Sequence, residues 1–222
     1  MPNIAIIGAS RGIGLEFVRQ YAADGWRVYA TTRTPDSPGA LGKTRGDIRI
    51  HHLDVRSDTH IARFADVLSK VALDVLVHNA GVLNSRGRAS PEEIAETMRV
   101  NAEAPIATVS ALIDSVIASE QKKIALISSV QGSGRPRHSS PDHYGDSKGE
   151  LNKRFRVIEP EWRSLGVTAV ALHPGYVKTD MTGQHAGITT TESVSGMRSL
   201  LAGLTPGDSG RFLDYRGKDI AW

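Results

Sequence analysis

Short apolar runs alternate with stretches of helical spacing along most of the chain, and this alternation limits the possible folds more than any other feature. The runs lack the polar–apolar alternation of a half-exposed strand, which is typical of parallel strands buried on both faces. They are Ile4–Ile7, Trp26–Thr31, Ile48–Leu53, Leu73–Val77, Lys123–Ile127 and Val167–Leu172. A final short strand is expected at the sheet edge, at Phe212–Tyr215.

Helices are expected between and after these strands, at 12–24, 58–70, 91–118, 143–164 and 191–203. Because successive parallel strands need right-handed crossovers, the pattern predicts an α/β protein with a doubly wound parallel sheet and helices on both faces. Ser90-Pro91-Glu92-Glu93 has the N-cap, proline and acidic first turn that begin a helix. The 222 residues contain no repeat, linker or low-complexity tract, so a single domain over 1–222 is predicted.

Composition excludes several classes of function. The absence of cysteine excludes disulfides, thiolate metal sites and a cysteine nucleophile. The net charge is only +3 and the basic residues are scattered, so we expect no nucleic-acid partner. No apolar run approaches the about 20 residues that span a bilayer. The segment Met1–Gly8 lacks the basic region of a signal peptide, and we expect a cytoplasmic protein.

Unusual residues follow several of the predicted strands. Gly8 comes after the first strand, Asn79 after the fourth, Ser129 after the fifth and Pro174 after the sixth. The carboxyl ends of parallel strands share one edge of the sheet, and open sheets of this kind bind ligands there. The sequence therefore locates a candidate site at this edge.

A glycine-rich loop joins the first strand to the first helix, with the sequence Gly8-Ala9-Ser10-Arg11-Gly12-Ile13-Gly14. In such a loop the first glycine permits a tight turn, the second lets the backbone approach a pyrophosphate, and the third lets helix and strand pack closely. The helix N-terminus then favours the phosphates. The spacing is G-x-x-x-G-x-G, and an ordinary glycine-containing turn is the alternative interpretation.

The end of the second strand bears on cofactor choice. Arg33 follows Gly14 by nineteen residues, and no carboxylate accompanies it at this turn. An acidic residue here would bind a ribose 2′-hydroxyl, whereas arginine accommodates a 2′-phosphate. Arg11 adds a second cation from the glycine loop. Each arginine alone is equally consistent with a solvated surface charge, and together they favour NADPH over NADH.

A tyrosine and a lysine four residues apart, Tyr144 and Lys148, share one face of a predicted helix. A nearby cation lowers the pKa of a phenol toward neutrality, so this pair is a candidate proton donor and its activator. Ser129 ends the preceding strand and can hold a substrate carbonyl oxygen beside the tyrosine. A serine nucleophile is the rival interpretation of Ser129, although no G-x-S-x-G motif surrounds it.

Two other groups of residues were weighed as ligand sites. The eight histidines show no H-E-x-x-H or comparable spacing, so no metal is expected. The loop Gly132–Asp142 carries Arg135, Arg137 and His138, which could attract an acidic substrate, although a solvated loop is the favoured interpretation.

Taken together, these motifs and their order resemble the short-chain dehydrogenase/reductase family over essentially the whole chain. The resemblance implies a single-domain Rossmann-like sheet that transfers hydride between a nicotinamide and a carbonyl/alcohol pair. It assigns the cofactor loop to Gly8, Gly12 and Gly14, the adenine contact to Asp54 and Val55, and a structural turn to Asn79, Ala80 and Gly81. It assigns Ser129, Tyr144 and Lys148 to catalysis, Asn101 to a helix bend and a proton relay, and Pro174, Gly175, Val177 and Thr179 to the nicotinamide carboxamide.

Within that family, the ending Ser209–Tyr215 and its continuation to Trp222 are similar to the C-factor and sniffer-type carbonyl reductases. Three positions depart from the family pattern. His78 stands where asparagine is usual, and the long spacing between Ser129 and Tyr144 leaves Ser128 as an alternative hydroxyl. Pro160 is expected to interrupt the helix after Lys148, a helix that often forms the subunit interface, so both homodimer and homotetramer stay open.

The resulting hypothesis is an enzyme that binds NADPH and then reduces a small aldehyde or ketone. Tyr144 donates the proton, Lys148 lowers the pKa of Tyr144 and holds the nicotinamide ribose, and Ser129 orients the carbonyl. Residues 181–191 are expected to close over the substrate as a flap. The alternatives are an NADPH-binding signalling or sensor protein with little turnover, and a hydrolase or lipid-directed activity.

Overall fold

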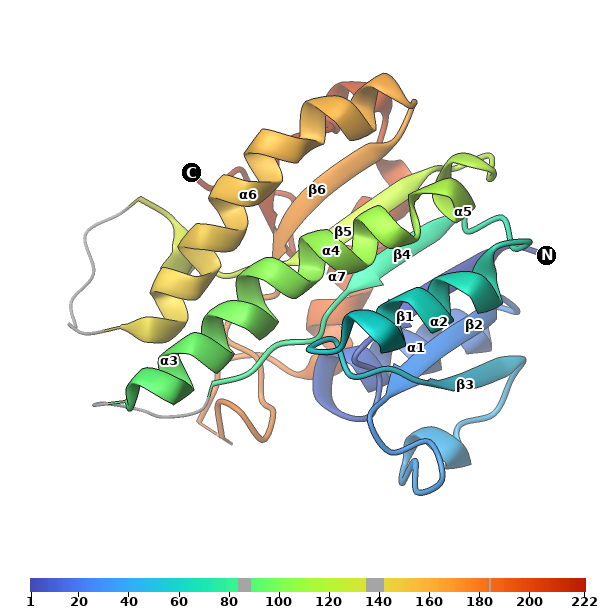
Figure 1. Ribbon diagram of the computed structural model, residues 1–222, viewed down its shortest axis with the longest axis horizontal. Helices are drawn as coiled ribbons and strands as arrows, with labels where there is room; N and C mark the ends of the chain where they lie inside the picture. Colours follow the sequence, from blue (N-terminus) through green and yellow to red (C-terminus); the bar gives the residue numbers. More distant parts are fainter. Residues whose placement is uncertain (84–88, 135–141, 184) are drawn as a thin grey trace.

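A parallel sheet of seven strands, in the order β3-β2-β1-β4-β5-β6-β7, forms the centre of the computed structural model, which describes residues 1–83, 89–134, 142–183 and 185–222 (Figure 1). All of the neighbouring strands pair in parallel. The strands are β1 (Asn3–Ile7), β2 (Arg27–Thr32), β3 (Ile48–His52), β4 (Val75–His78), β5 (Lys123–Ile127), β6 (Thr168–His173) and β7 (Phe212–Asp214). The predicted strands are thus confirmed, with ends that shift by one or two residues.

Helices cover both faces of this sheet, and each face has its own apolar core. Phe17 of α1 and Met197 of α7 pack with Ile4 and Ile6 on one face. Helices α2, α4 and α6 pack with Ile7 on the other face, in front of the sheet in Figure 1. The longer helices are α1 (Gly12–Ala23), α2 (Asp58–Leu68), α3 (Pro91–Met98), α4 (Ala104–Ala111), α5 (Ile113–Ile117), α6 (His143–Ser164) and α7 (Thr190–Gly203). The predicted doubly wound α/β fold is confirmed.

The single helix predicted over 91–118 is wrong, because the chain forms three helices there. A π-helical turn at Arg99–Glu103 separates α3 from α4, and Leu112 separates α4 from α5. Pro105 has no N–H to donate to the carbonyl four residues earlier, that of Asn101, so regular α-helical bonding fails at this point. The predicted start of the helix is confirmed: Ser90 and Glu93 form a reciprocal capping box.

Pro160 does not interrupt α6, contrary to the expectation from sequence. The helix continues through Pro160 to Ser164. Side-chain contacts hold this last part of the helix in place, since the Oε1 atom of buried Glu159 accepts hydrogen bonds from Arg163 Nε at 2.8 Å and from Ser209 Oγ at 2.6 Å. Trp162 is buried on the same helix. These contacts offset the one backbone hydrogen bond that proline removes.

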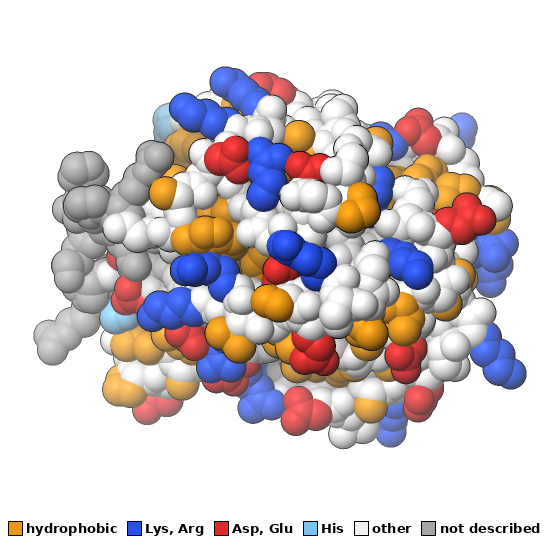
Figure 2. Space-filling view, turned by 90° about the horizontal axis from the view of Figure 1, so that it is seen from above, with side chains coloured by type: hydrophobic (Ala, Val, Ile, Leu, Met, Phe, Trp, Pro, Cys, Tyr) orange, Lys and Arg blue, Asp and Glu red, His pale blue; other side chains and the backbone are white. Residues whose placement is uncertain are grey.

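Short 3-10 turns complete the secondary structure at Leu41–Lys43, Val130–Gly132 and Pro206–Asp208. On the face shown in Figure 2, Lys and Arg side chains are interspersed with Asp and Glu rather than gathered in one patch. Among the helices of the described ranges, none combines the length and the apolar character needed to cross a membrane.

Candidate active site

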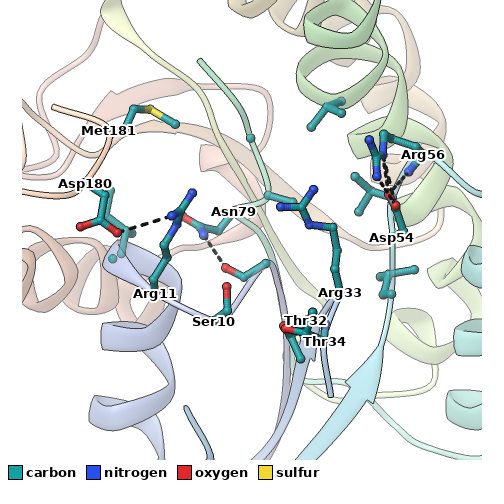
Figure 3. A pocket seen from close by; sticks show the side chains of 18 of the residues that line it. Ser10, Arg11, Thr32, Arg33, Thr34, Asp54, Arg56, Asn79, Asp180 and Met181 are labelled. Atoms are coloured by element: carbon teal, nitrogen blue, oxygen red, sulfur yellow. Dashed lines mark hydrogen bonds and ion pairs between the residues drawn. The ribbon is translucent and has the colours of Figure 1, made fainter. Parts of the chain in front are cut away.

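A cavity of about 370 Å³ opens at the carboxyl edge of the sheet (Figure 3). It lies where the glycine loop after β1 meets the segments that follow β2, β3, β4 and β6. Its lining includes many residues predicted to bind a cofactor: Gly8, Ser10, Arg11, Gly12, Ile13, Arg33, Asp54, Val55, Asn79, Ala80, Gly81 and Thr179. Residues that sequence reasoning did not assign to the cofactor also line it: Thr32, Thr34, Leu53, Arg56, Glu96, Val100, Asp180 and Met181.

The glycine loop is shaped by close backbone contacts. Gly8 has a φ of +83°, and a Cβ there would stand 2.7 Å from Ala80 Cα. At Gly14, a Cβ would stand 2.0 Å from the Gly8 carbonyl oxygen, which also accepts a hydrogen bond from Asn79 Nδ2 at 2.8 Å. No side chain fits in either place, because real Cβ atoms do not approach this closely. Both glycines therefore have the steric roles that the motif predicts.

The N-terminus of α1 differs from those of α2, α3, α6 and α7. Those helices begin with Ser57, Ser90, Asp142 and Thr189, whose side chains each accept a backbone N–H. Helix α1 begins after Arg11, with no side-chain cap and no acidic residue in its first turn. Its first-turn N–H groups and the positive end of the helix dipole therefore suit an anion from outside the chain. The uncapped turn and the close backbone packing at Gly8 and Gly14 fit a dinucleotide pyrophosphate.

Two arginines approach the cavity from different sides. Arg33 extends from the end of β2 into the cavity, between the Arg11 side and Asp54 (Figure 3). Arg11 Nη1 lies 3.5 Å from the Asp180 carboxylate, and both side chains are largely exposed. An exposed pair of this kind contributes little to stability and exchanges readily with another charge. Arg33 and Arg11 therefore both line the cavity, and Arg11 also forms an ion pair with Asp180.

Arg56 is the most strongly bonded side chain of the cavity, and the sequence analysis missed it. Its Nη2 donates to Asp54 Oδ2 at 2.6 Å and its Nε to Asp54 Oδ1 at 2.9 Å. Its Nη1 donates to Glu96 Oε1 at 2.8 Å. Hydrogen bonds from Arg56 hold the pKa of Asp54 at about 2. An arginine two residues after Asp54 was the available signal, but its partner Glu96 lies forty residues farther along the chain.

Tyr144 lies on α6 and Ser129 at the end of β5, and neither is among the residues that line this cavity. The Tyr144 phenol and the Ser129 hydroxyl form a hydrogen bond. Burial raises the pKa of Tyr144 to about 12, the hydrogen bond with Ser129 acts in the opposite direction, and Asp142 adds to the rise. Lys148, which was expected to lower this pKa, is not among the groups that shift it in the folded chain. Tyr144 is a neutral phenol at pH 7 and can donate a proton.

Lys148 lies one helical turn after Tyr144 and is buried. Its Nζ donates to the Ile127 carbonyl oxygen at 2.8 Å and stands 5.8 Å from the centroid of the Tyr144 ring. Burial lowers its pKa to about 8. A Cβ on Gly81, which lines the cavity, would lie 3.6 Å from Nζ. Because no side chain is present at Gly81, the ammonium group lies close to the cavity wall.

Asn101, in the π-helical turn, is fully buried and joins this group to the loop after β4. Its side chain accepts from the Val82 backbone N–H at 2.8 Å and donates to the Val82 carbonyl at 2.8 Å. It also donates to Ser147 Oγ at 3.0 Å, and Ser147 in turn donates to the Tyr144 carbonyl at 2.7 Å. These contacts fix Asn101 against the helix that carries Tyr144.

The two serines at the end of β5 have different partners. Ser128 Oγ is buried and donates to Asn152 Oδ1 at 2.6 Å. Ser129 Oγ accepts the Gln131 N–H at 3.2 Å and bonds to Tyr144. The structure therefore brings Ser129, and not the alternative Ser128, to the tyrosine.

Of the segment after β6, Thr179, Asp180 and Met181 line the cavity, whereas the predicted contacts Pro174, Gly175 and Val177 do not. Gly175 has a φ of +87°, and Thr179 Cγ2 would lie 3.4 Å from a Cβ on Gly12. Val177 pairs with Ile188, and the Lys178 N–H donates to the Ile188 carbonyl at 2.9 Å. Pro174 is held through its carbonyl, which accepts the Ser193 hydroxyl at 2.6 Å. Within the predicted 181–191 flap, Ile188 is thus bonded to the segment that precedes the flap.

His78, the residue that departs from the family pattern, is buried at the end of β4. Burial, together with the charge of Lys148, lowers its pKa to about 3. Its Nε2 has no hydrogen-bond partner among the described residues. Among the residues that the structure describes, no group of three or more His, Asp or Glu side chains is arranged to hold a metal. The proposed acidic-substrate residues Arg135, Arg137 and His138 lie outside the described residues.

Comparison with known proteins decides the family. The model of the short chain dehydrogenase family matches residues 2–187. The chain belongs to the short-chain dehydrogenase family. This confirms the resemblance stated from the glycine loop, the Tyr144–Lys148 pair and their order along the sequence.

This short-chain dehydrogenase has relatives of several kinds. It is 34% identical over 163 residues to C-signal of Myxococcus xanthus, an alignment that covers 72% of this chain and 98% of the relative. Its structure is similar to an NADPH-bound carbonyl reductase from chicken fatty liver, with a TM-score of 0.87, 30% identity and coverage of 100% and 99% of the two chains. The fold also matches the carbonyl reductase Sniffer of D. melanogaster, with a TM-score of 0.89, 24% identity and full coverage of both chains.

Proposed function

We propose that this short-chain dehydrogenase is an NADPH-preferring reductase of small aldehydes or ketones. One observation carries the proposal: a neutral, half-buried Tyr144 is hydrogen-bonded to Ser129, and Lys148 of the same helix stands behind a cavity that fits a dinucleotide. A phenol held beside a hydroxyl suits proton transfer to a carbonyl oxygen. The NADPH-bound carbonyl reductase with 30% identity supports the same interpretation.

The chain's own residues would divide the work as follows. A bound nicotinamide supplies hydride to the carbonyl carbon. Ser129 holds the carbonyl oxygen and Tyr144 gives it a proton, which completes the alcohol. Lys148, held by the Ile127 carbonyl, offers its remaining N–H groups to the nicotinamide ribose and a positive charge that stabilises the tyrosinate. Asn101 supports proton return to Tyr144 through water.

The predicted cofactor contacts divide by position. Gly8, Ser10, Gly12, Ile13 and Gly14 hold the pyrophosphate at the start of α1. Asp54 and Val55 face the adenine, Asn79, Ala80 and Gly81 support the loop, and Pro174, Gly175, Val177 and Thr179 face the carboxamide. Arg33 and Arg11 give the preference for NADPH, because a 2′-phosphate gains charge-assisted hydrogen bonds from a guanidinium.

Two experiments test these assignments. NADPH oxidation is followed by absorbance with a panel of aldehydes, ketones, quinones and dicarbonyls. We expect Tyr144→Phe to lower the rate by about 10³-fold without changing NADPH affinity, because it removes the proton donor alone. The matched control is Tyr29→Phe, a tyrosine in the middle of β2. If the wild-type protein binds NADPH and reduces none of the panel, the NADPH-binding signalling alternative replaces the reductase.

Cofactor preference is tested separately by calorimetric titration. We expect Arg33→Gln to weaken NADPH binding by about tenfold and NADH binding by less than about twofold, the loss of one charged hydrogen bond. An equal loss for both cofactors would contradict the role of Arg33. Closure of residues 181–191 over the substrate, a cytoplasmic location and a homodimer or homotetramer stay predictions.

A further inference from the structure

Arg56 stands in the cavity with an unusually complete set of partners. All three of its guanidinium nitrogens donate to carboxylates, two of them to Asp54 and the third to Glu96. Its backbone N–H also donates to Asp54 Oδ1, at 3.0 Å. Figure 3 shows the Asp54–Arg56 pair on the side of the cavity that faces Arg33. The pair therefore belongs to the cavity wall rather than to a distant surface.

The position of Asp54 poses an electrostatic problem for the proposed cofactor. Asp54 and Arg33 line the same cavity, and the charge of Arg33 is felt at Asp54. A carboxylate that shares a cavity with a 2′-phosphate repels its negative charge. A free Asp54 would also compete with the phosphate for Arg33. The preference attributed to Arg33 alone would then be weakened.

We infer that Arg56 is a positioning residue that makes the cavity selective for the 2′-phosphorylated cofactor by occupying and neutralising Asp54. The inference rests on the proposed function, since it concerns the binding of NADPH. Arg56 acts through Asp54 because its Nε and Nη2 atoms already donate to that carboxylate. Its third nitrogen, Nη1, donates to Glu96 of α3. Arg33 is left to meet the phosphate.

The experiment compares dissociation constants for NADPH and NADH, measured by calorimetric titration without any substrate. With Arg56→Gln, we expect the ratio of NADPH to NADH affinity to fall by about five- to tenfold, because one uncompensated charge then faces the phosphate across partly screened solvent. Arg56→Lys keeps the positive charge and should retain most of the wild-type ratio. Arg49→Gln is the matched control. Arg49 lies on β3, pairs with Asp47 just before that strand, and does not line the cavity.

The double variant Arg56→Gln/Asp54→Asn separates the proposed route from direct phosphate contact. If Arg56 acts by neutralising Asp54, removing that carboxylate restores the affinity ratio to within about twofold of wild type, because the carboxylate that competes for Arg33 is then absent. A ratio that stays low in the double variant overturns the inference and assigns Arg56 to the phosphate itself. A ratio that does not change in Arg56→Gln, with thermal unfolding as in wild type, overturns it as well.

These outcomes are distinct from failure of the proposed function. The inference is tested by changes in the ratio relative to wild type, so it is decided whichever cofactor the wild-type protein prefers. A wild-type protein that binds NADH as tightly as NADPH contradicts the proposed cofactor preference alone. A wild-type protein that binds neither dinucleotide overturns both.

Discussion

The two halves of the candidate site are built differently. The catalytic group, which we define as Ser129, Tyr144, Lys148 and Asn101, is buried apart from the half-buried Tyr144, and the fold itself satisfies its polar atoms through partners such as Ile127 and Val82. The cofactor cavity, the pocket of Figure 3, is open and carries exposed charges, and the helix at its base begins without a cap.

The difference shows which partners satisfy the polar groups of each half of the site. The catalytic group is fixed when the chain folds, because buried polar groups must find partners inside the protein. The cavity leaves N–H groups and arginines to be satisfied by a ligand. Substitutions in the catalytic group should therefore change rate, and substitutions in the cavity should change binding.

The largest effect is expected for Lys148→Met. We expect the reductase rate to fall by about 10³-fold or more while the unfolding free energy at pH 7 stays the same or rises by about 1–3 kcal/mol, since a buried ammonium is removed. Burial lowers the pKa of Lys148 from 10.5 to about 8. Between about pH 8 and pH 10.5 the unfolded chain binds more protons than the folded chain, so the unfolding free energy of the wild type rises with pH. The difference in unfolding free energy between the variant and the wild type therefore shrinks.

Steady-state rates and urea unfolding at pH 7 and pH 9 measure both effects. Lys153→Met is the control, because Lys153 lies on the same helix with an exposed side chain. A variant that loses rate and stability together would show that Lys148 is held for folding, and the proposed contrast between the two halves would fail.

Gly14→Ala should break the cofactor cavity. The new Cβ would stand 2.0 Å from the Gly8 carbonyl oxygen and 2.6 Å from Asn79 Nδ2, so the loop or the helix must move. We expect a loss of about 3 kcal/mol in unfolding free energy and loss of NADPH binding. Gly203→Ala, at the end of α7 with no atom within 4 Å of a Cβ, is the control. Unchanged calorimetric binding in Gly14→Ala would contradict the close packing.

His78→Asn should give the smallest effect and sharpens the boundary between the core and the catalytic group. The pKa of His78 is lowered from 6.5 to about 3, so between these values the unfolded chain binds a proton that the folded chain does not. Stability therefore falls as the pH drops below 6.5, by about 2 kcal/mol at pH 5 from this group. Urea unfolding at pH 7 and pH 5 should show a weaker pH dependence in the variant. Equal dependence in both proteins would place the acid sensitivity elsewhere.

Much of this could be read from the sequence, because the determining interactions are local or repetitive. Continuous apolar runs indicated the buried strands, and the doubly wound sheet follows from their alternation with helices. The Gly8–Gly14 loop, the capping box at Ser90 and the spacing of Tyr144 and Lys148 are likewise local patterns. In a parallel sheet, strand ends share an edge, so the location of the site followed from the strand pattern.

The errors arose where backbone geometry depends on partners elsewhere. The break at Arg99–Glu103 combines Pro105 with a buried Asn101 that bonds to Val82, nineteen residues away. The continuation of α6 through Pro160 depends on buried Glu159 and its contact with Ser209, fifty residues away. Helical periodicity contains no information about such partners, because it reports only which face of a segment is apolar.

The sequence by itself determined the class of fold, the edge of the sheet that carries the site, and the residue types from which the site is made. Only the tertiary structure decided which groups meet: Ser129 rather than Ser128 beside Tyr144, Arg56 bonded to Asp54 and Glu96, and a half-buried Tyr144 whose pKa rises. The physical reason is that hydrogen-bond partners and burial, which set charge and pKa, come from segments far apart in the chain and are defined only once those segments pack.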